Sequence, residues 1–276
     1  EFKLGDGTTL SAQFLESPGA TTTIVFLHGI LGSSFPLNAA SGLLREAANA
    51  EVIALDLRGH GFSEGRPGDI DYPGQYEDDV AEVIAEVRTK QPQQKVLLAG
   101  HSMGGGISLR YAQKVREQSP YPVAGYLLFA PHLGWSSPTM PKVSSAEGEK
   151  FARVHLPRIL GLNFLNLFGI SAFNGLRTLF FNLPPELPLR SYSYRASENN
   201  APADYRAALD ALSSAGAPLL VVVGSSDEAF FGARYAEAIG NHGRVALLPG
   251  ANHNGVLTDP RTVATVTEWM TALGPG

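Results

Sequence analysis

A serine between two glycines forms a motif that could do chemistry. Ser102 lies in a G-x-S-x-G pattern at residues 100–104, directly after the apolar residues 96–99. A serine hydroxyl is a weak nucleophile unless it is exposed, next to a base and close to donors for the oxyanion. A sharp turn between a strand and a helix would expose it, and Gly100 and Gly104 would let neighbouring backbone pass close. The motif predicts a nucleophile at Ser102, and the alternative is a glycine-rich turn that only packs.

Two later segments supply a base and an acid that could activate this serine. Asp227 follows the apolar residues 219–223 by a short loop, and His253 follows residues 245–248 in the same way. Functional residues of a parallel sheet lie at the carboxyl ends of its strands, so we expect these side chains at one edge. We predict that His253 takes the serine proton and that Asp227 orients the imidazole ring.

Other residues could take these two roles. Glu228 stays open as the acid, and His132 or His155 as the base. Asp56 also follows an apolar run. The tight turn at residues 58–61 after it favours a carboxylate that accepts bonds from backbone N–H groups.

The oxyanion of an acyl-transfer reaction needs two hydrogen-bond donors about 3 Å away. We expect one to be the backbone N–H of Met103, which follows the serine at the start of a helix. The second should come from the loop after an earlier apolar run, where we choose the Ile30 N–H and where Gly29 lets the chain turn inward. His28 and His101 fit supporting roles beside the site. The alternative is an ordinary loop at His28 and Gly29.

These residues need a scaffold that brings distant strand ends together. The predicted strands are 2–4, 8–15, 21–27, 51–57, 95–101, 123–130, 218–223 and 244–248. The predicted helices are 36–49 with Ser34 as its cap, 75–90, 103–117, 202–215, 229–239 and 260–273 with Asp259 as its cap. The first two strands should form a hairpin around an Asp-Gly turn. The alternation predicts an α/β fold whose mostly parallel, eight-stranded sheet carries helices on both faces.

The alternation of strands and helices stops between residues 131 and 201, where we find no strand-like run. Four apolar residues in this segment share one face of a predicted helix: Leu160, Phe164, Leu167 and Phe168. We expect residues 131–201 to be a lid inserted between core segments 1–130 and 202–276. The lid would shape an apolar acyl pocket and could touch a lipid surface, or its apolar residues only pack it on the core.

Together these motifs resemble the α/β-hydrolase superfamily. The residues that carry the resemblance are His28 and Gly29, 56–63 (Asp-Leu-Arg-Gly-His-Gly-Phe-Ser), 100–105, Asp227 and His253. Within the superfamily the chain is most similar to monoacylglycerol lipases and lysophospholipase-like esterases. The resemblance implies an α/β-hydrolase fold and a serine hydrolase that cleaves small carboxylic esters with apolar acyl chains. Such an enzyme needs neither a metal nor an organic cofactor.

The same three residues allow other functions. They could act on another bond, as in an aminopeptidase, an amidase, a carbon–carbon hydrolase or a perhydrolase. The scaffold could also serve a ligand receptor with little turnover, although binding alone does not need all three side chains.

The composition argues against several classes of protein. The formal net charge is −5 and no run of Lys or Arg stands out, so we expect no nucleic-acid partner. The absence of cysteine excludes disulfides, thiolate metal sites and a cysteine nucleophile. The long uncharged run at residues 159–176 contains several Asn and Gly residues, which favours a soluble protein over a membrane span. We expect a cytoplasmic protein, and secretion stays open because the chain begins at Glu1.

Overall fold

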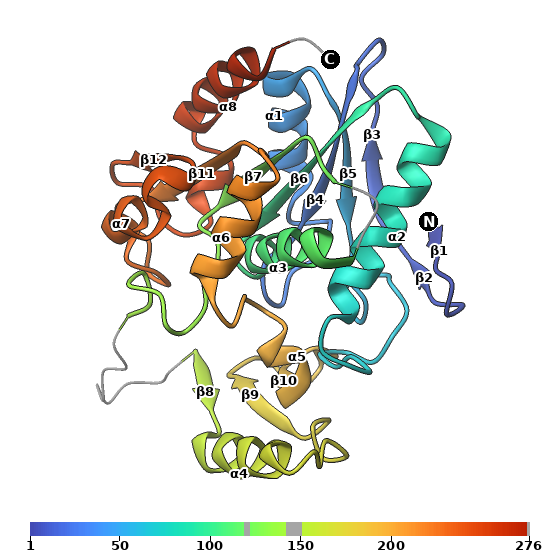
Figure 1. Ribbon diagram of the computed structural model, residues 1–276, viewed down its shortest axis with the longest axis vertical. Helices are drawn as coiled ribbons and strands as arrows, with labels where there is room; N and C mark the ends of the chain where they lie inside the picture. Colours follow the sequence, from blue (N-terminus) through green and yellow to red (C-terminus); the bar gives the residue numbers. More distant parts are fainter. Residues whose placement is uncertain (119–121, 142–150, 275–276) are drawn as a thin grey trace.

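A mostly parallel sheet forms the centre of the protein (Figure 1). The computed structural model describes residues 1–118, 122–141 and 151–274. Its main sheet has seven strands in the order β12-β11-β7-β6-β4-β5-β3. The strands, in chain order, are β3 (Ala12–Leu15), β4 (Thr22–Leu27), β5 (Glu51–Leu55), β6 (Lys95–His101), β7 (Gly125–Phe129), β11 (Leu219–Gly224) and β12 (Arg244–Leu248). Neighbouring strands run parallel except β3, which is antiparallel to β5.

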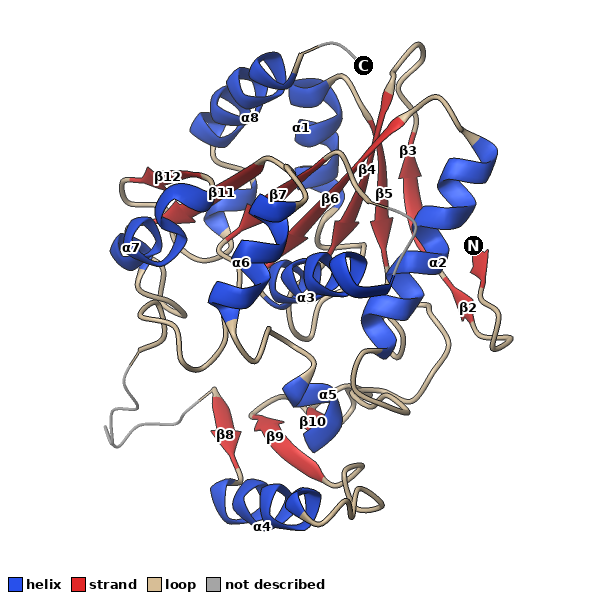
Figure 2. Cartoon of the chain, viewed as in Figure 1, coloured by secondary structure: helices blue, strands red, loops and turns tan. Residues whose placement is uncertain are grey.

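Helices cover both faces of this sheet (Figure 2). Residues 131–201 are called the insert below. The helices outside it are α1 (Asn38–Ala48), α2 (Gln75–Lys90), α3 (Met103–Gln118), α6 (Tyr205–Ser214), α7 (Tyr235–Ile239) and α8 (Pro260–Leu273). Alternate residues of a strand point to opposite faces. In β4, Val25 and Leu27 pack in the core cluster shared with α2, α3 and α6, whereas Ile24 and Phe26 pack in the cluster shared with α1 and α8. The expected α/β architecture is therefore confirmed.

The predicted eight-stranded sheet is wrong by one strand. The first hairpin pairs β1 (Phe2–Lys3) with β2 (Thr9–Leu10) in a separate two-stranded sheet. The predicted strand at residues 8–15 is interrupted at Ser11. The Ser11 N–H donates to Ser63 Oγ, and its carbonyl accepts from the Asp56 N–H. These bonds to the loop after β5 separate β2 from β3, so only β3 joins the main sheet.

Two predicted helices differ from the observed ones. Helix α1 is preceded by Leu37, and Ser34 does not cap it, because residues 34–37 form a separate turn in which the Leu37 N–H donates to the Ser34 carbonyl. The Ser34 N–H itself donates to Asp56 Oδ1. The predicted helix at 229–239 is reduced to α7, since the Phe231 N–H donates to the Thr139 carbonyl outside this segment and a 3-10 turn (Gly232–Arg234) follows. Helix α8 begins at Pro260 with Asp259 as its cap, as predicted.

The prediction that the segment 131–201 lacks strands is wrong. It contains a three-stranded antiparallel sheet in the order β10-β9-β8. Its elements are β8 (Ala152–Val154), α4 (Leu156–Leu167), β9 (Arg177–Phe181), β10 (Ser191–Ser193) and α5 (Tyr194–Glu198). The strands have three to five residues, too short for a visible alternation of apolar and polar side chains. Residues 142–150 of this insert lie outside the described residues.

The two ends of the insert lie side by side on α3. A Cβ atom on Gly106 would lie 2.2 Å from the Asn200 carbonyl oxygen and 2.8 Å from that of His132. Farther out, Arg195 of the insert binds Asp69 of the core with its Nε and Nη2 atoms, both at 2.9 Å. Both ends of the insert therefore lie beside one helix, and an ion pair holds the insert farther out.

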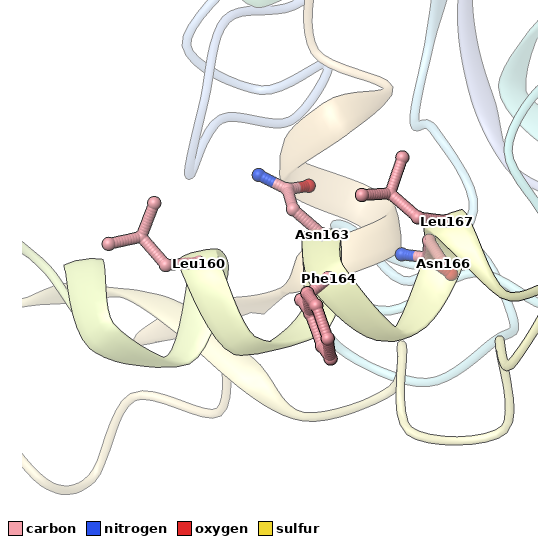
Figure 3. Close-up of a pocket in the computed structure, with 5 residues that line it drawn as sticks. All are labelled: Leu160, Asn163, Phe164, Asn166 and Leu167. Atoms are coloured by element: carbon pink, nitrogen blue, oxygen red, sulfur yellow. The ribbon is translucent and has the colours of Figure 1, made fainter.

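Helix α4 lies on the side of the insert away from the main sheet (Figure 1). It exposes apolar side chains. An open pocket of about 520 Å³ lies along this helix. Figure 3 shows the side chains that line it: Leu160, Asn163, Phe164, Asn166 and Leu167. In the described part of the chain, no helix is long and apolar enough to span a bilayer.

Candidate active site

Ser102 lies in the sharp turn between β6 and α3. Its φ is 52°, in the left-handed region that a residue with a side chain rarely adopts. The Ser102 N–H donates to the Phe129 carbonyl at 2.9 Å, and its carbonyl accepts from the His132 N–H at 2.9 Å. A Cβ on Gly100 would lie 2.4 Å from Gly104 backbone atoms, so the turn cannot carry a side chain there. Strain of this kind is found where surrounding structure over-determines a functional residue.

His253 and Asp227 form a hydrogen-bonded pair at the carboxyl end of the sheet. His253 Nδ1 lies 2.9 Å from Asp227 Oδ2, and the Asp227 side chain is fully buried. The other carboxylate oxygen accepts the N–H groups of Ala229 at 2.8 Å and Phe230 at 2.9 Å. Because the Asp227 carboxylate can only accept hydrogen bonds, the ring hydrogen of His253 must lie on Nδ1. This leaves His253 Nε2 free to take a proton.

His101 connects this pair to the serine turn. Its ring centroid lies 4.8 Å from that of His253, and its Nε2 atom lies 3.1 Å from the His253 carbonyl oxygen. A carbonyl only accepts, so His101 Nε2 carries the hydrogen. Burial lowers the pKa of His101 to about 4, which keeps this ring neutral. Across the described ranges, Ser102 Oγ and His253 Nε2 make no hydrogen bond with each other. In enzymes without bound substrate the hydrogen bond between nucleophile and base is often long, and it shortens when substrate binds.

The loop of residues 28–32 approaches the serine through Gly29. A Cβ on Gly29 would lie 3.2 Å from Ser102 Cβ and 3.0 Å from His101 Nδ1. The Gly29 carbonyl accepts from His28 Nδ1 at 2.8 Å and from the Gly32 N–H at 3.0 Å. The Ile30 N–H belongs to the same peptide unit and points the opposite way, since the unit is planar and trans.

His28 is held so that it can donate to this loop. Its Nε2 atom accepts from the Leu57 N–H at 3.1 Å, so Nδ1 carries the hydrogen that binds the Gly29 carbonyl. Burial lowers the pKa of His28 to about 4, so the ring stays neutral. Among the residues that the structure describes, neither the Ile30 N–H nor the Met103 N–H donates a hydrogen bond. Both remain available to a developing negative charge.

The other candidate residues have different partners. Glu228 Oε2 accepts the backbone N–H of His253 at 3.0 Å rather than its ring. His155 caps α4 within the insert, where its Nδ1 accepts from the Arg158 N–H. His132 stacks on Phe230 with ring centroids 5.4 Å apart.

Asp56 binds backbone as expected from its sequence context. Its carboxylate accepts the N–H groups of Ser34 and Phe62, which ties the loops after β4 and β5 together. Within the described ranges, no three His, Cys, Asp or Glu side chains are grouped so that they could hold a metal ion.

Sequence reasoning missed Tyr192, a residue of the insert. Its hydroxyl lies 2.9 Å from the Leu31 nitrogen and 2.7 Å from His60 Nε2. No local pattern marks this tyrosine among the other aromatic residues of the insert, because its partners are far away in the sequence.

Comparison with known proteins adds a family and a set of similar folds. The model of the Alpha/beta hydrolase family matches residues 24–266. A relative, the uncharacterized hydrolase YugF of Bacillus subtilis, is 35% identical over 107 residues, which are 39% of this chain and 37% of that protein. The match therefore spans little more than a third of the length of that relative.

Solved structures match nearly the whole chain. Est1E from Butyrivibrio proteoclasticus with bound ferulic acid has a TM-score of 0.66 at 16% identity, covering 99% of this chain and 98% of its own. A soluble variant of monoglyceride lipase from Saccharomyces cerevisiae, in complex with a substrate analog, has a TM-score of 0.64 at 16% identity, covering 100% and 96%. At these identities the likeness shows the fold.

Proposed function

The chain belongs to the alpha/beta hydrolase family, and from this premise we propose that it is a serine esterase that cleaves carboxylic esters with apolar acyl chains. The observation that carries the proposal is the pair of His253 Nδ1 and buried Asp227 Oδ2 at 2.9 Å, beside the strained turn of Ser102. A buried carboxylate behind a histidine orients the ring and stabilises the imidazolium that forms during proton transfer.

In the first half of the reaction, Ser102 Oγ attacks the ester carbonyl carbon while His253 Nε2 takes the hydroxyl proton. The N–H groups of Ile30 and Met103 donate to the oxygen that becomes negatively charged. When the tetrahedral intermediate collapses, the bond to the alcohol oxygen breaks. His253 gives its proton to that oxygen, and the acyl group remains on Ser102.

In the second half, water replaces the alcohol. His253 removes a proton from the water as its oxygen attacks the acyl carbon, and the same two N–H groups stabilise the second tetrahedral intermediate. The bond to Ser102 Oγ then breaks, Oγ recovers a proton from His253, and the carboxylic acid leaves. No step uses a metal or an organic cofactor.

The apolar character of the acyl group rests on the insert. Its partly buried side chains Met140, Leu179, Phe181 and Leu189 pack against the same core cluster as Ile30 and Leu31. Apolar walls beside a few polar groups are typical of ligand sites. We therefore propose that residues 131–201 act as a lid over a core of residues 1–130 and 202–276. We propose monoacylglycerol- or lysophospholipid-like esters as the substrates.

The exposed face of α4 supports contact with a lipid surface. Leu160 and Phe164 are each 60% exposed, Leu167 is 81% exposed and the adjoining Phe168 is 68% exposed. The helix has a single charged residue, Arg158, near its start. Contiguous apolar surface of this kind marks an interaction site, and an acyl ester substrate would be found in lipid.

A panel of p-nitrophenyl esters of increasing acyl length tests the proposed activity. We expect hydrolysis with a preference for chains longer than acetyl, and a loss of at least about a thousandfold in kcat for Ser102→Ala. A fluorophosphonate should label the wild-type protein at Ser102. Full activity in Ser102→Ala would exclude the proposed mechanism.

Two further outcomes separate the alternatives. Labelling at Ser102 without ester hydrolysis, together with cleavage of aminoacyl amides, would indicate that the three residues act on another bond. A serine that is not labelled and a protein that hydrolyses nothing would favour a ligand receptor.

A further inference from the structure

Tyr192 connects the insert to the 28–32 loop. It belongs to β10, and none of its side chain is exposed. Its hydroxyl contacts the Leu31 nitrogen at 2.9 Å, across a separation of 161 residues in the sequence, and His60 Nε2 at 2.7 Å. A side chain of the insert therefore contacts the loop that carries the Ile30 N–H.

The direction of these hydrogen bonds follows from His60. Its Nδ1 atom lies 2.9 Å from the Arg58 carbonyl oxygen, which can only accept, so Nδ1 carries the hydrogen. Burial lowers the pKa of His60 to about 3, so the ring is neutral and Nε2 accepts. The Tyr192 O–H therefore donates to His60, and its oxygen accepts the Leu31 N–H. The hydroxyl is held in one orientation by two partners.

The 28–32 loop requires such support because Leu31 is strained. Its φ is 60°, a left-handed conformation that is unfavourable for a residue with a side chain. The Leu31 N–H belongs to the peptide unit directly after the one that carries the Ile30 N–H. His28 holds the first of these units through the Gly29 carbonyl, and Tyr192 holds the second. Together they define the orientation of both units that flank Ile30.

We propose that Tyr192 is a positioning residue that keeps the Ile30 N–H directed at the oxyanion formed on Ser102, with His60 as its support. This inference rests on the proposed esterase function. It assigns to the insert a part in the chemical step, in addition to its part in substrate binding.

Tyr192→Phe removes only the hydroxyl and is the direct test. The matched control is Tyr194→Phe, which removes a hydroxyl two residues later that binds Asn163 inside the insert. On a water-soluble p-nitrophenyl ester, we expect kcat of Tyr192→Phe to fall about tenfold, less than the loss of a whole oxyanion donor. We expect KM to change less than about twofold, and Tyr194→Phe to keep near wild-type kcat.

A trifluoromethyl ketone distinguishes positioning of the oxyanion donor from a general structural role. It adds to Ser102 and forms an oxyanion, so its inhibition constant should rise in Tyr192→Phe by the factor by which kcat/KM falls. Binding of the alcohol product, which has no acyl carbonyl oxygen, should not change. The double variant Tyr192→Phe with His60→Gln should lose little more than the larger single loss, because both side chains act through one chain of bonds.

Equal kcat and equal ketone inhibition in Tyr192→Phe and Tyr194→Phe would overturn the inference. If Tyr192→Phe does not fold, His60→Gln alone gives the same measurements. Failure of the proposed esterase function is distinct, since the wild-type protein itself would then neither hydrolyse esters nor bind the ketone covalently.

Discussion

At the residue scale, the candidate site depends on hydrogen bonds that occupy both oxygens of Asp227 and one ring nitrogen of His253. Asp227 uses one oxygen for two backbone N–H groups and the other for His253 Nδ1. His253 Nε2 is the ring atom left without a partner in the described chain. Because the donors around Asp227 are fixed, the ring can take only one tautomer, in which Nδ1 carries the hydrogen and Nε2 can accept a proton.

Replacement of Asp227 by Asn tests this argument. An amide offers one acceptor oxygen for two sets of donors, so its NH₂ group must face either the backbone N–H groups or the ring. We expect the His253 ring to take the wrong tautomer and kcat to fall by about 10³ to 10⁴ at pH 7. Stopped-flow hydrolysis of a p-nitrophenyl ester measures the loss.

Glu228→Gln is the matched control for this substitution. Glu228 accepts the backbone N–H of His253, and a glutamine oxygen can accept the same bond. We expect at most a few-fold change in kcat. If instead Glu228→Gln is as damaging as Asp227→Asn, the neighbouring glutamate is the orienting acid.

At the scale of elements, the end of the insert next to the core is held by several contacts, whereas its helix α4 is exposed. Its two ends meet on α3 at Gly106, and Arg195 binds Asp69 of the core. Tyr192 of β10 reaches the 28–32 loop. Helix α4, in contrast, packs mainly within the insert and exposes most of its apolar side chains. An element with this surface is suited to an apolar partner outside the chain.

The exposed residues of α4 provide a test of lipid contact. Replacing Phe164 and Leu167 by Ser removes apolar area, so we expect binding to phosphatidylcholine vesicles to weaken at least about tenfold. Hydrolysis of an emulsified ester should fall in parallel, whereas kcat on a water-soluble ester should stay near wild type. Vesicle co-sedimentation and the two assays measure these effects.

Phe14→Ser serves as the control, because Phe14 is also exposed but lies on β3 at the edge of the main sheet. A loss of vesicle binding in Phe14→Ser as large as in the α4 variant would argue against a specific role of this helix. So would vesicle binding that the α4 substitutions leave unchanged.

At the scale of the whole molecule, neutral histidines are buried where the loops after β4, β5 and β6 meet. His28, His60 and His101 are 1%, 2% and 5% exposed. Burial lowers their pKa values to about 4, 3 and 4. The unfolded chain binds these protons near the ordinary histidine pKa of about 6.5, whereas the folded chain does not. Stability is therefore present above that pH and is lost as the pH falls toward 4.

We expect the free energy of unfolding to decrease between pH 7 and pH 5. Each of these histidines contributes a slope of up to about 1.4 kcal/mol per pH unit below pH 6.5, which is large against a typical stability of about 5 to 15 kcal/mol. Urea unfolding at pH 7.5, about 6 and about 5 measures the slope. His60→Gln removes one titrating ring and should make the slope shallower, whereas stability that is constant across this range would contradict the argument.

The predictable part of the fold is the part with a local pattern. Helix α2 was predicted at residues 75–90 and is observed at Gln75–Lys90, because Val80, Val83, Ile84 and Val87 recur at helical spacing and are buried. The short strands of the insert were not predicted, since three to five residues are too few to show an alternation of apolar and polar side chains. The predicted cap of α1 was wrong for another reason: Asp56, in the loop after β5, binds the Ser34 N–H and holds Ser34 in a turn before the helix.

For the candidate site, the sequence by itself determined the residue types and the turns that carry them. The glycines around Ser102 and the apolar runs before Asp227 and His253 are local features, which can be recognised from a few neighbouring residues. Only the tertiary structure decided that Asp227 rather than Glu228 meets the His253 ring, and that Tyr192 reaches Leu31. The physical reason is distance along the sequence: hydrophobic periodicity and the conformational freedom of glycine depend only on residues a few positions apart. A hydrogen bond between distant side chains exists only once packing has brought both partners within about 3 Å.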